Sequence, residues 1–122
     1  MDVSRLPVAV VEKWSSETLG EGFVPFPKKL VRCLAQLFSG AKSIRQLQTL
    51  LAIVDFKRPN LSRLPSAEYL AFVAGLPKDE FLETLNDLQE KGYIRVSGDP
   101  AALNISLEGL LSAIERESRD QT

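Results

Sequence analysis

The chain has 122 residues, of which 44% are hydrophobic and 25% charged, and its formal net charge is −1. These values are ordinary for one globular domain that buries a core without disulfides or a metal. The lack of His and the single Cys exclude a disulfide framework, a Cys/His zinc site and a His-based catalytic triad. We therefore expect no enzymatic activity, cofactor, metal or small-molecule substrate, and we interpret Cys33 as a small core residue.

The N-terminal residues do not follow the pattern of a signal peptide, because Pro7 and Glu12 interrupt their apolar run. No apolar stretch approaches the length that spans a membrane. We therefore expect a cytoplasmic protein that does not bind a membrane.

We divide the chain into an N-terminal arm at 1–21, one domain at 22–118 and a tail at 119–122. The arm is predicted to contain a short helix that ends at Trp14. Trp14 has two interpretations. It packs on the domain's own core, which we favour, or it anchors a dimer, since Trp is enriched in the cores of interfaces.

The domain is predicted to begin with an extended segment that leads into a helix. Residues 22–26 read as an extended entry, and an edge strand is one interpretation because edge strands tolerate Pro. Pro27 suits the first turn of the helix that follows, which is predicted to stop at Ser39 and Gly40. The inward positions of this helix are Leu30, Leu34, Leu37 and Phe38.

The next helix is predicted to begin at Ser43, because Ser43 and Gln46 have the spacing of a capping box. Its inward stripe consists of Ile44, Leu47, Leu51 and Val54, widened by Leu50 and Ile53. Such a broad stripe predicts the central and most buried helix of the domain. A linker at 56–65, closed off by Pro59 and Pro65, follows it.

Residues 66–92 carry the most informative pattern in the chain. Ser66 can cap a short helix that ends at Gly75, and after a tight turn Pro77 starts a longer helix that ends at Gly92. The inward residues are Ala67, Leu70, Val73 and Ala74 in the first helix and Phe81, Leu82, Leu85 and Leu88 in the second.

The remaining residues are predicted to form a hairpin and a closing helix. Alternation with period two predicts strands near 93–97 and 102–106, joined by the turn "GDPA". A helix at roughly 107–118 is amphipathic through Leu110, Leu111 and Ile114.

This order of elements predicts a mainly α fold with a small β-hairpin, a winged helix-turn-helix in which the hairpin is the wing. The predicted core consists of Leu34, Leu47, Leu51, Val54, Leu70, Phe81, Leu85, Leu88 and Ile94.

The stretch "GFVPFPKKLVRCLAQLFSGAKSIRQLQTLLAIVDFKR" resembles the opening of phage replication protein O-type DNA-binding domains. The matching pieces are Gly22-Phe23, Phe26-Pro27 and the run at 50–54, and the resemblance covers roughly residues 22–94. It implies origin or operator DNA binding through a winged helix. Such domains usually carry Ser, Thr, Arg and Lys on the recognition helix, whereas this chain carries carboxylates there.

Charge is polarised along the chain. Residues 1–64 hold ten Lys/Arg and five Asp/Glu, whereas residues 65–122 hold five and eleven. The helix predicted at 77–91 is acidic, and an acidic surface in a DNA groove is repelled by the phosphates. The overall charge of −1 therefore conceals a basic and an acidic half.

Three hypotheses follow. In the first, the chain is a DNA-binding protein in transcription regulation or DNA replication and holds double-stranded DNA mainly through its basic N-terminal half. The candidate DNA-binding residues are Lys28, Lys29, Arg32, Lys42, Arg45, Lys57, Arg58, Arg63, Lys78, Asn86 and Arg95. Lys78 and Asn86 are the candidate base readers among them.

In the second hypothesis, the winged helix is a protein-interaction module whose acidic helix meets a basic partner or a second copy of the chain. The candidate interaction residues are Trp14, Asp79, Glu80, Glu83 and Asp87. In the third, the winged helix is a scaffold within a larger assembly.

We also predict a homodimer. The arm, through Trp14, and the closing helix, through Leu110, Leu111 and Ile114, flank the domain as dimerisation elements often do. The alternative is that the same residues pack together inside one monomer.

Overall fold

The computed structural model describes residues 8–21, 26–57, 64–99 and 101–120, without the side chains of residues 9–11. Residues 22–25 of the predicted entry segment and the candidates Arg58 and Arg63 lie outside the described residues. Among those described, the chain forms six helices and one two-stranded antiparallel sheet. The prediction of a mainly α fold with a small β-hairpin is confirmed.

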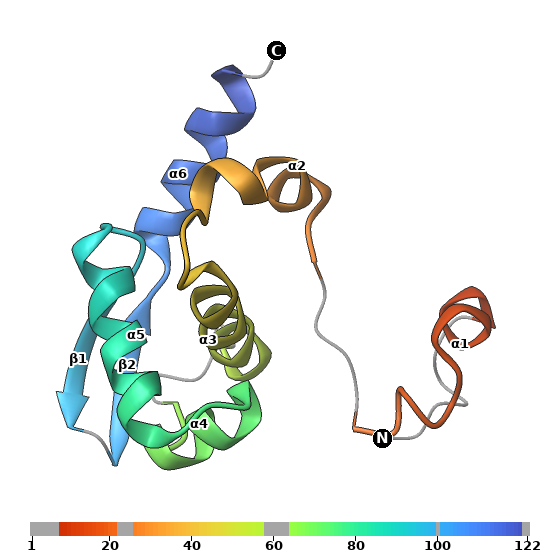
Figure 1. The fold of residues 1–122 in the computed structure, drawn as a ribbon, viewed down its shortest axis with the longest axis horizontal. Helices are drawn as coiled ribbons and strands as arrows, with labels where there is room; N and C mark the ends of the chain where they lie inside the picture. Colours follow the sequence, from red (N-terminus) through yellow and green to blue (C-terminus); the bar gives the residue numbers. More distant parts are fainter. Residues whose placement is uncertain (1–7, 22–25, 58–63, 100, 121–122) are drawn as a thin grey trace.

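The helices form two groups (Figure 1). Three central helices pack on one another, and the hairpin follows the last of them; a second pair packs together at one end of the domain. The short first helix lies apart from both groups. The elements are α1 (Val8–Trp14), α2 (Lys28–Leu37), α3 (Ser43–Phe56), α4 (Ala67–Ala74), α5 (Lys78–Glu90), β1 (Arg95–Asp99), β2 (Ala102–Ser106) and α6 (Glu108–Asp120). The central group is α3, α4 and α5, and the end pair is α2 and α6.

Local sequence explains the tight connection between α4 and α5. The Ser66 hydroxyl accepts a hydrogen bond from the backbone N–H of Tyr69 (3.3 Å), which caps α4 as predicted. Gly75 takes a left-handed conformation (φ 77°), and the N–H of Leu76 donates to the Ala71 carbonyl (3.0 Å). Pro77 then provides the N-cap of α5. The spacing between α4 and α5 is therefore fixed by residues within the turn itself.

The hairpin extends from the end of α5. β1 pairs antiparallel with β2, with Val96 opposite Ile105. The strand predicted at 93–97 begins and ends two residues later than expected, whereas the strand at 102–106 is confirmed. The N–H of Leu64 donates to the Leu103 carbonyl (2.8 Å), so the chain before α4 contacts β2 from outside the hairpin.

One core extends from the central helices and the hairpin to α2 and α6. Leu70, Phe81, Leu85, Leu88 and Ile94 are buried, as predicted. The other predicted core residues are half-buried and pack against its edge: Leu34, Leu47, Leu51 and Val54. Cys33 is also fully buried, as expected for a small core residue.

The prediction for α3 is wrong in two respects. Lys42 is the N-cap and no side chain caps the helix, so Ser43 lies inside α3 and does not form a capping box. The predicted inward residue Ile44 is 67% exposed, while the face that is buried consists of Gln46, Thr49, Leu50, Ala52 and Ile53. The physical reason is that α3 has two apolar faces. α4 and α5 pack on α3, in which Leu50 and Ile53 are buried, and the stripe of Leu47, Leu51 and Val54 stays half-buried.

Four other predicted inward side chains are exposed. Val73 on α4, Leu82 on α5 and Leu111 on α6 are exposed. Trp14, which we expected to pack on the domain's own core, is also exposed because α1 stands away from the domain (Figure 1). Finally, α6 continues to Asp120, two residues into the predicted tail.

Among the described residues, no helix is both long enough and apolar enough to cross a membrane.

Candidate functional site

The charged surface of α5 is the first candidate site. α5 turns Phe81, Thr84, Leu85 and Leu88 toward the core, and the Thr84 hydroxyl donates to the carbonyl of Glu80 one turn earlier (2.7 Å). Its carboxylates therefore occupy the sides and the outer face. Asp79, Glu83 and Glu90 are exposed, while Glu80 and Asp87 are half-buried.

The first turn of α3 supplies cations to these carboxylates. Lys42 Nζ lies 2.6 Å from Glu83 Oε1 and 3.8 Å from Asp87 Oδ2. Arg45 Nε lies 4.0 Å from Glu80 Oε2. The contacts bring the predicted DNA-binding residues Lys42 and Arg45 together with three of the predicted protein-interaction residues. The basic and acidic halves of the sequence thus meet inside one molecule.

The hydrogen bond between Lys42 and Glu83 shifts both groups. It raises the pKa of Lys42, and the negative charges of Glu83 and Asp87 add to the shift. It lowers the pKa of the Glu83 carboxyl, helped by the positive charge of Lys42. Both side chains stay charged over a wide pH range, although their exposure to solvent keeps the interaction weak.

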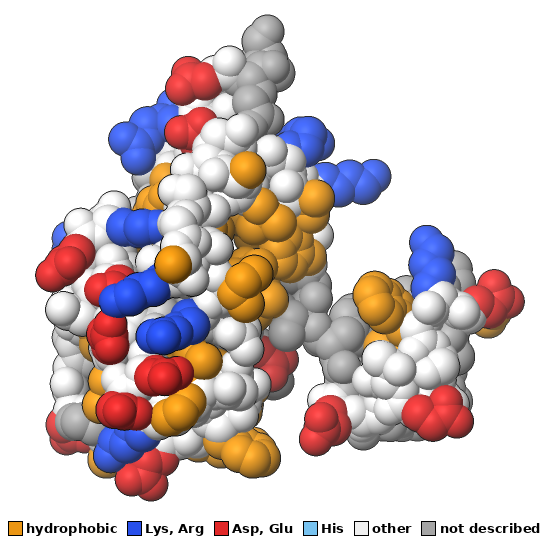
Figure 2. Space-filling view, in the orientation of Figure 1, with side chains coloured by type: hydrophobic (Ala, Val, Ile, Leu, Met, Phe, Trp, Pro, Cys, Tyr) orange, Lys and Arg blue, Asp and Glu red, His pale blue; other side chains and the backbone are white. Residues whose placement is uncertain are grey.

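Lys91 continues this row of charges beyond the end of α5. Its Nζ donates to Gln46 Oε1 (2.7 Å) and lies 5.8 Å from the ring centre of Phe38 and 5.7 Å from that of Tyr93. The Tyr93 hydroxyl donates to the Leu37 carbonyl (2.7 Å), and burial raises its pKa. Figure 2 shows the outcome, a band in which blue and red side chains alternate across the front of the domain.

The other candidate cations fall in different places. Lys29 Nζ lies 3.1 Å from Glu115 Oε1, so the α2 set of Lys28, Lys29 and Arg32 belongs to the end of the molecule where α2 packs on α6. Lys78 Nζ lies 3.2 Å from Glu68 Oε1, which places a carboxylate beside this candidate base reader. Three further candidates are exposed: Lys57 after α3, Asn86 on the outer face of α5 and Arg95 on β1.

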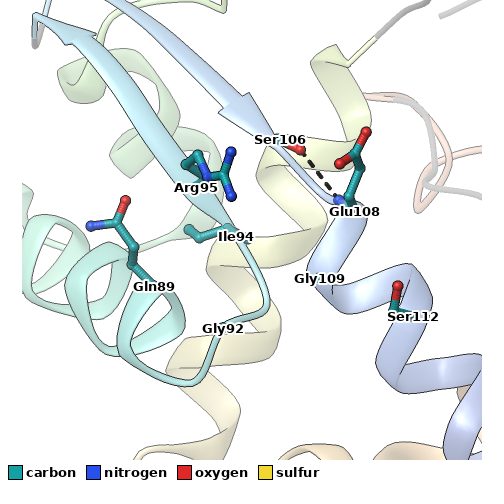
Figure 3. A pocket seen from close by; sticks show the side chains of 8 residues that line it. All are labelled: Gln89, Gly92, Ile94, Arg95, Ser106, Glu108, Gly109 and Ser112. Carbon is teal, nitrogen blue, oxygen red and sulfur yellow. Dashed lines mark hydrogen bonds between the residues drawn. The ribbon is translucent and has the colours of Figure 1, made fainter.

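A polar pocket of about 470 Å³ lies between the end of α5, the strands and the start of α6 (Figure 3). Arg95 and Glu108 give it one charge of each sign. Gln89 Oε1 accepts a hydrogen bond from the N–H of Val96 (2.7 Å), and Ser106 Oγ accepts one from the N–H of Glu108 (3.4 Å). The first of these hydrogen bonds ties β1 to α5, and the second joins the end of β2 to the start of α6.

One wall of this pocket is a close contact between two glycines. A Cβ atom at Gly109 would overlap the carbonyl oxygen of Gly92. The N–H of Leu110 donates to the Tyr93 carbonyl (2.8 Å) in the same place. α6 therefore begins directly on the turn that joins α5 to β1.

A second cavity is apolar and lies on the other side of α3. It has a volume of about 450 Å³, and its walls come from α2, α3, α6 and the residues before α2 and α6. We call it the apolar groove. It is lined by Phe26, Pro27, Leu30, Leu50, Leu51, Val54, Leu107, Leu110, Leu111 and Ile114. The groove was not predicted from the sequence because Leu51 and Val54 were assigned to the covered core, although an apolar stripe too wide for one interface was a visible signal.

The outer face of α4 is aromatic. Phe72 is 79% exposed, and its ring lies 6.4 Å from that of Tyr69, which in turn packs edge-on against Phe56 at 5.6 Å. Val73 is exposed on the same helix. This face was predicted to be partly buried through Val73, and no site was assigned to it.

Comparison of the chain with protein-family models, with curated proteins and with solved structures found no match.

Proposed function

We propose that the chain is a winged helix-turn-helix protein that binds double-stranded DNA, as a transcription regulator or as a replication-type binder of an origin or operator. α4 and α5 are the helix pair, α5 is the recognition helix and the hairpin is the wing. The packing of α3, α4 and α5 on one another, and the contact of Leu64 with β2, support this assignment.

The observation that carries the proposal is the pairing of α5 carboxylates with cations of α3. An unpaired acidic helix would be repelled by phosphates. Here Lys42 lies between Glu83 and Asp87, and Arg45 lies beside Glu80, so the repulsion is reduced where α5 would approach DNA. The same two cations sit at the border of the α5 face and can contact phosphates that flank the groove.

The proposed division of roles follows from exposure. Lys42 and Arg45 contact phosphates, Arg95 adds a contact from the wing, and Asn86 reads bases from the outer face of α5. Asn suits this role because its side chain can form two hydrogen bonds with adenine. Lys78 reads bases only if it leaves Glu68.

The test is a titration of the chain against mixed-sequence duplex DNA at several salt concentrations. Replacing Lys42 and Arg45 by Ala should weaken binding on all sequences and reduce the salt slope by about 0.9 for each phosphate that is no longer neutralised. Arg116→Ala is the matched control, since it removes an exposed cation from α6. Substitution of Lys28, Lys29 and Arg32 should also leave the slope unchanged, because α2 lies with α6. An unchanged slope in the Lys42/Arg45 variant would show that this surface does not hold DNA.

A second candidate function is a winged-helix protein-interaction module. The exposure of Phe72 and Tyr69 on α4 favours it, because aromatic side chains are enriched in the centres of protein interfaces. The two functions predict opposite effects of Glu83→Gln. Removing this charge should strengthen non-specific DNA binding by relieving repulsion, whereas it should weaken a complex in which α5 meets a basic protein. Absence of salt-dependent DNA binding by the unmodified chain would favour the second function.

A further inference from the structure

The apolar groove lacks a cover in the described part of the chain. Its walls are apolar side chains from three helices, and Leu111 at its edge is 58% exposed. Val31 on α2 is also exposed. Figure 2 shows hydrophobic side chains gathered on this side of the domain. Uncovered apolar surface of this kind marks a site that another group covers.

The arm carries a matching set of uncovered apolar side chains. In α1, Trp14 is 61% exposed and Val8 is 71% exposed. The chain reverses after α1 at Ser15 (φ 69°), whose hydroxyl accepts a hydrogen bond from the N–H of Thr18 (3.3 Å). Leu19 is buried. The arm is thus folded as far as Leu19, yet it leaves its one Trp in solvent.

Charge favours contact between the arm and the rim of the groove. The described arm, residues 8–21, contains three Glu and one Lys, whereas α2 contains two Lys, one Arg and no acidic residue. Of these α2 cations, Lys29 pairs with Glu115 of α6. Opposite net charges on the arm and α2 favour their encounter on the α2 side of the groove, whereas α6, with four acidic and two basic residues, repels the arm and so orients it across α2.

The position of α1 favours a groove on another molecule. Pro27 is extended (φ −64°, ψ 140°) immediately before α2, and a residue that precedes Pro, here Phe26, is restricted to extended conformations. Phe26 and Pro27 thus run extended where the chain enters α2, and α1 stands away from the domain in Figure 1. Two copies that exchange arms would each cover the groove of the other in a closed two-fold arrangement.

We propose that the apolar groove is the docking site for the N-terminal arm of a second copy of this chain, with Trp14 as the anchor that enters the groove beside Leu111. The proposal is independent of DNA binding. It differs from the simple expectation that α6 forms the dimer contact, because Leu110 and Ile114 are buried within one molecule where α2 packs on α6.

A small ligand is the competing occupant of the apolar groove. Ligand pockets of this volume are usually apolar with a few polar groups that fix the orientation of the ligand. The groove is lined by apolar side chains alone, so no side chain there could orient a polar ligand. An anchor held by a covalently attached arm does not need such groups, which is why we favour the arm.

The chain's single Trp makes the test direct, because all tryptophan emission comes from Trp14. We would record sedimentation equilibrium and fluorescence of the full chain over a dilution series from hundreds to below one micromolar. We expect dimers at the high end, with Trp14 emission shifted to the blue, and monomers with solvent-exposed emission at the low end. A blue-shifted emission from protein that sediments as a monomer would show that each arm covers its own groove and would overturn the proposal. A monomer with exposed Trp14 at all concentrations would also overturn it.

Two variants locate the contact. Leu111→Asp places a charge at the edge of the groove and should abolish both dimerisation and the blue shift. Phe72→Asp is the matched control, because it places the same charge at an exposed apolar position on α4 and should change neither. Dimers that persist in Leu111→Asp would overturn the proposal by placing the interface elsewhere. Both variants change exposed positions, so circular dichroism should show unchanged folding.

Discussion

The two sides of α3 differ in whether their side chains have partners within the described part of the chain. Toward α5, the cations at the start of the helix meet carboxylates, so charges that look polarised in sequence are balanced in space. Toward α2 and α6, Leu51 and Val54 line a groove that the described residues leave open. The composition is ordinary in both charge and hydrophobicity, yet one face of α3 has its charges paired and the other has apolar side chains that the described residues leave uncovered.

The difference matters because the two kinds of surface contribute unequal free energies. Exposed ion pairs contribute little to stability, and salt screens them. Apolar surface contributes roughly 25 cal/mol for each Å² removed from water. In the proposed dimer, association free energy would therefore come mainly from the groove, whereas the charged face would select a partner by the sign of its charge.

The largest expected effect tests which face of α3 is covered. Leu50→Ala should lower the free energy of unfolding by about 2–5 kcal/mol, because the Leu50 side chain of α3 is fully buried. Ile44→Ala should change it by less than about 0.5 kcal/mol, because Ile44 projects into solvent. Urea denaturation of both variants measures the contrast. Equal losses would mean that α3 is rotated about its axis so that Ile44 also faces the core.

A smaller effect is expected where α6 begins. Gly109→Ala requires α6 to move away from the Gly92 carbonyl and should cost about 1–3 kcal/mol in the free energy of unfolding. Because α6 forms a wall of the apolar groove, the same movement of α6 should also change the shape of the groove. Ser112→Ala, an exposed change on the same helix, is the control. Thermal unfolding of the two variants compares them, and a Gly109→Ala protein as stable as the control would contradict the close contact.

The smallest effect concerns the charged face. The pKa of Glu83 is lowered by its hydrogen bond with Lys42, so this pair stabilises the fold above the carboxyl's unfolded pKa, and that contribution is lost as pH falls through the folded pKa. The pKa of Lys42 is raised, so its contribution is present below its unfolded pKa and is lost as pH rises through the folded one. Carboxyl NMR titration should place the Glu83 midpoint higher in Lys42→Ala than in the unmodified chain. Identical midpoints would show that the pair does not persist in solution.

Sequence reasoning predicted the parts of the fold that are specified locally. Ser66, Gly75 and Pro77 act on backbone atoms within one turn of themselves, so the α4–α5 connection was readable without tertiary information. The hairpin was placed to within two residues because its alternation has period two. Phe81, Leu85 and Leu88 recur on one face of a helix that has a single covered side, and their burial was predicted.

Sequence reasoning failed where the answer depended on which elements are neighbours. In α3 the apolar residues surround most of the helix, so periodicity alone could not show that Leu50 and Ile53 are buried while Ile44 faces solvent. The charge count along the chain placed Lys42 in the basic half and Glu83 in the acidic half, although the two side chains are in contact across 41 residues of sequence. The candidate site was thus predicted as a list of residues, and only their packing divided it into the α3–α5 face and the α2–α6 end.

The burial of Cys33 makes its thiol a reporter of how often the domain opens. It is the chain's one thiol, and it lies fully buried on the inner face of α2. A thiol reagent in solution can reach it only during the moments when α2 separates from its neighbours or the whole domain opens. The rate at which the thiol is modified therefore depends on how often these openings occur. Opening of the domain can thus be measured without an engineered label.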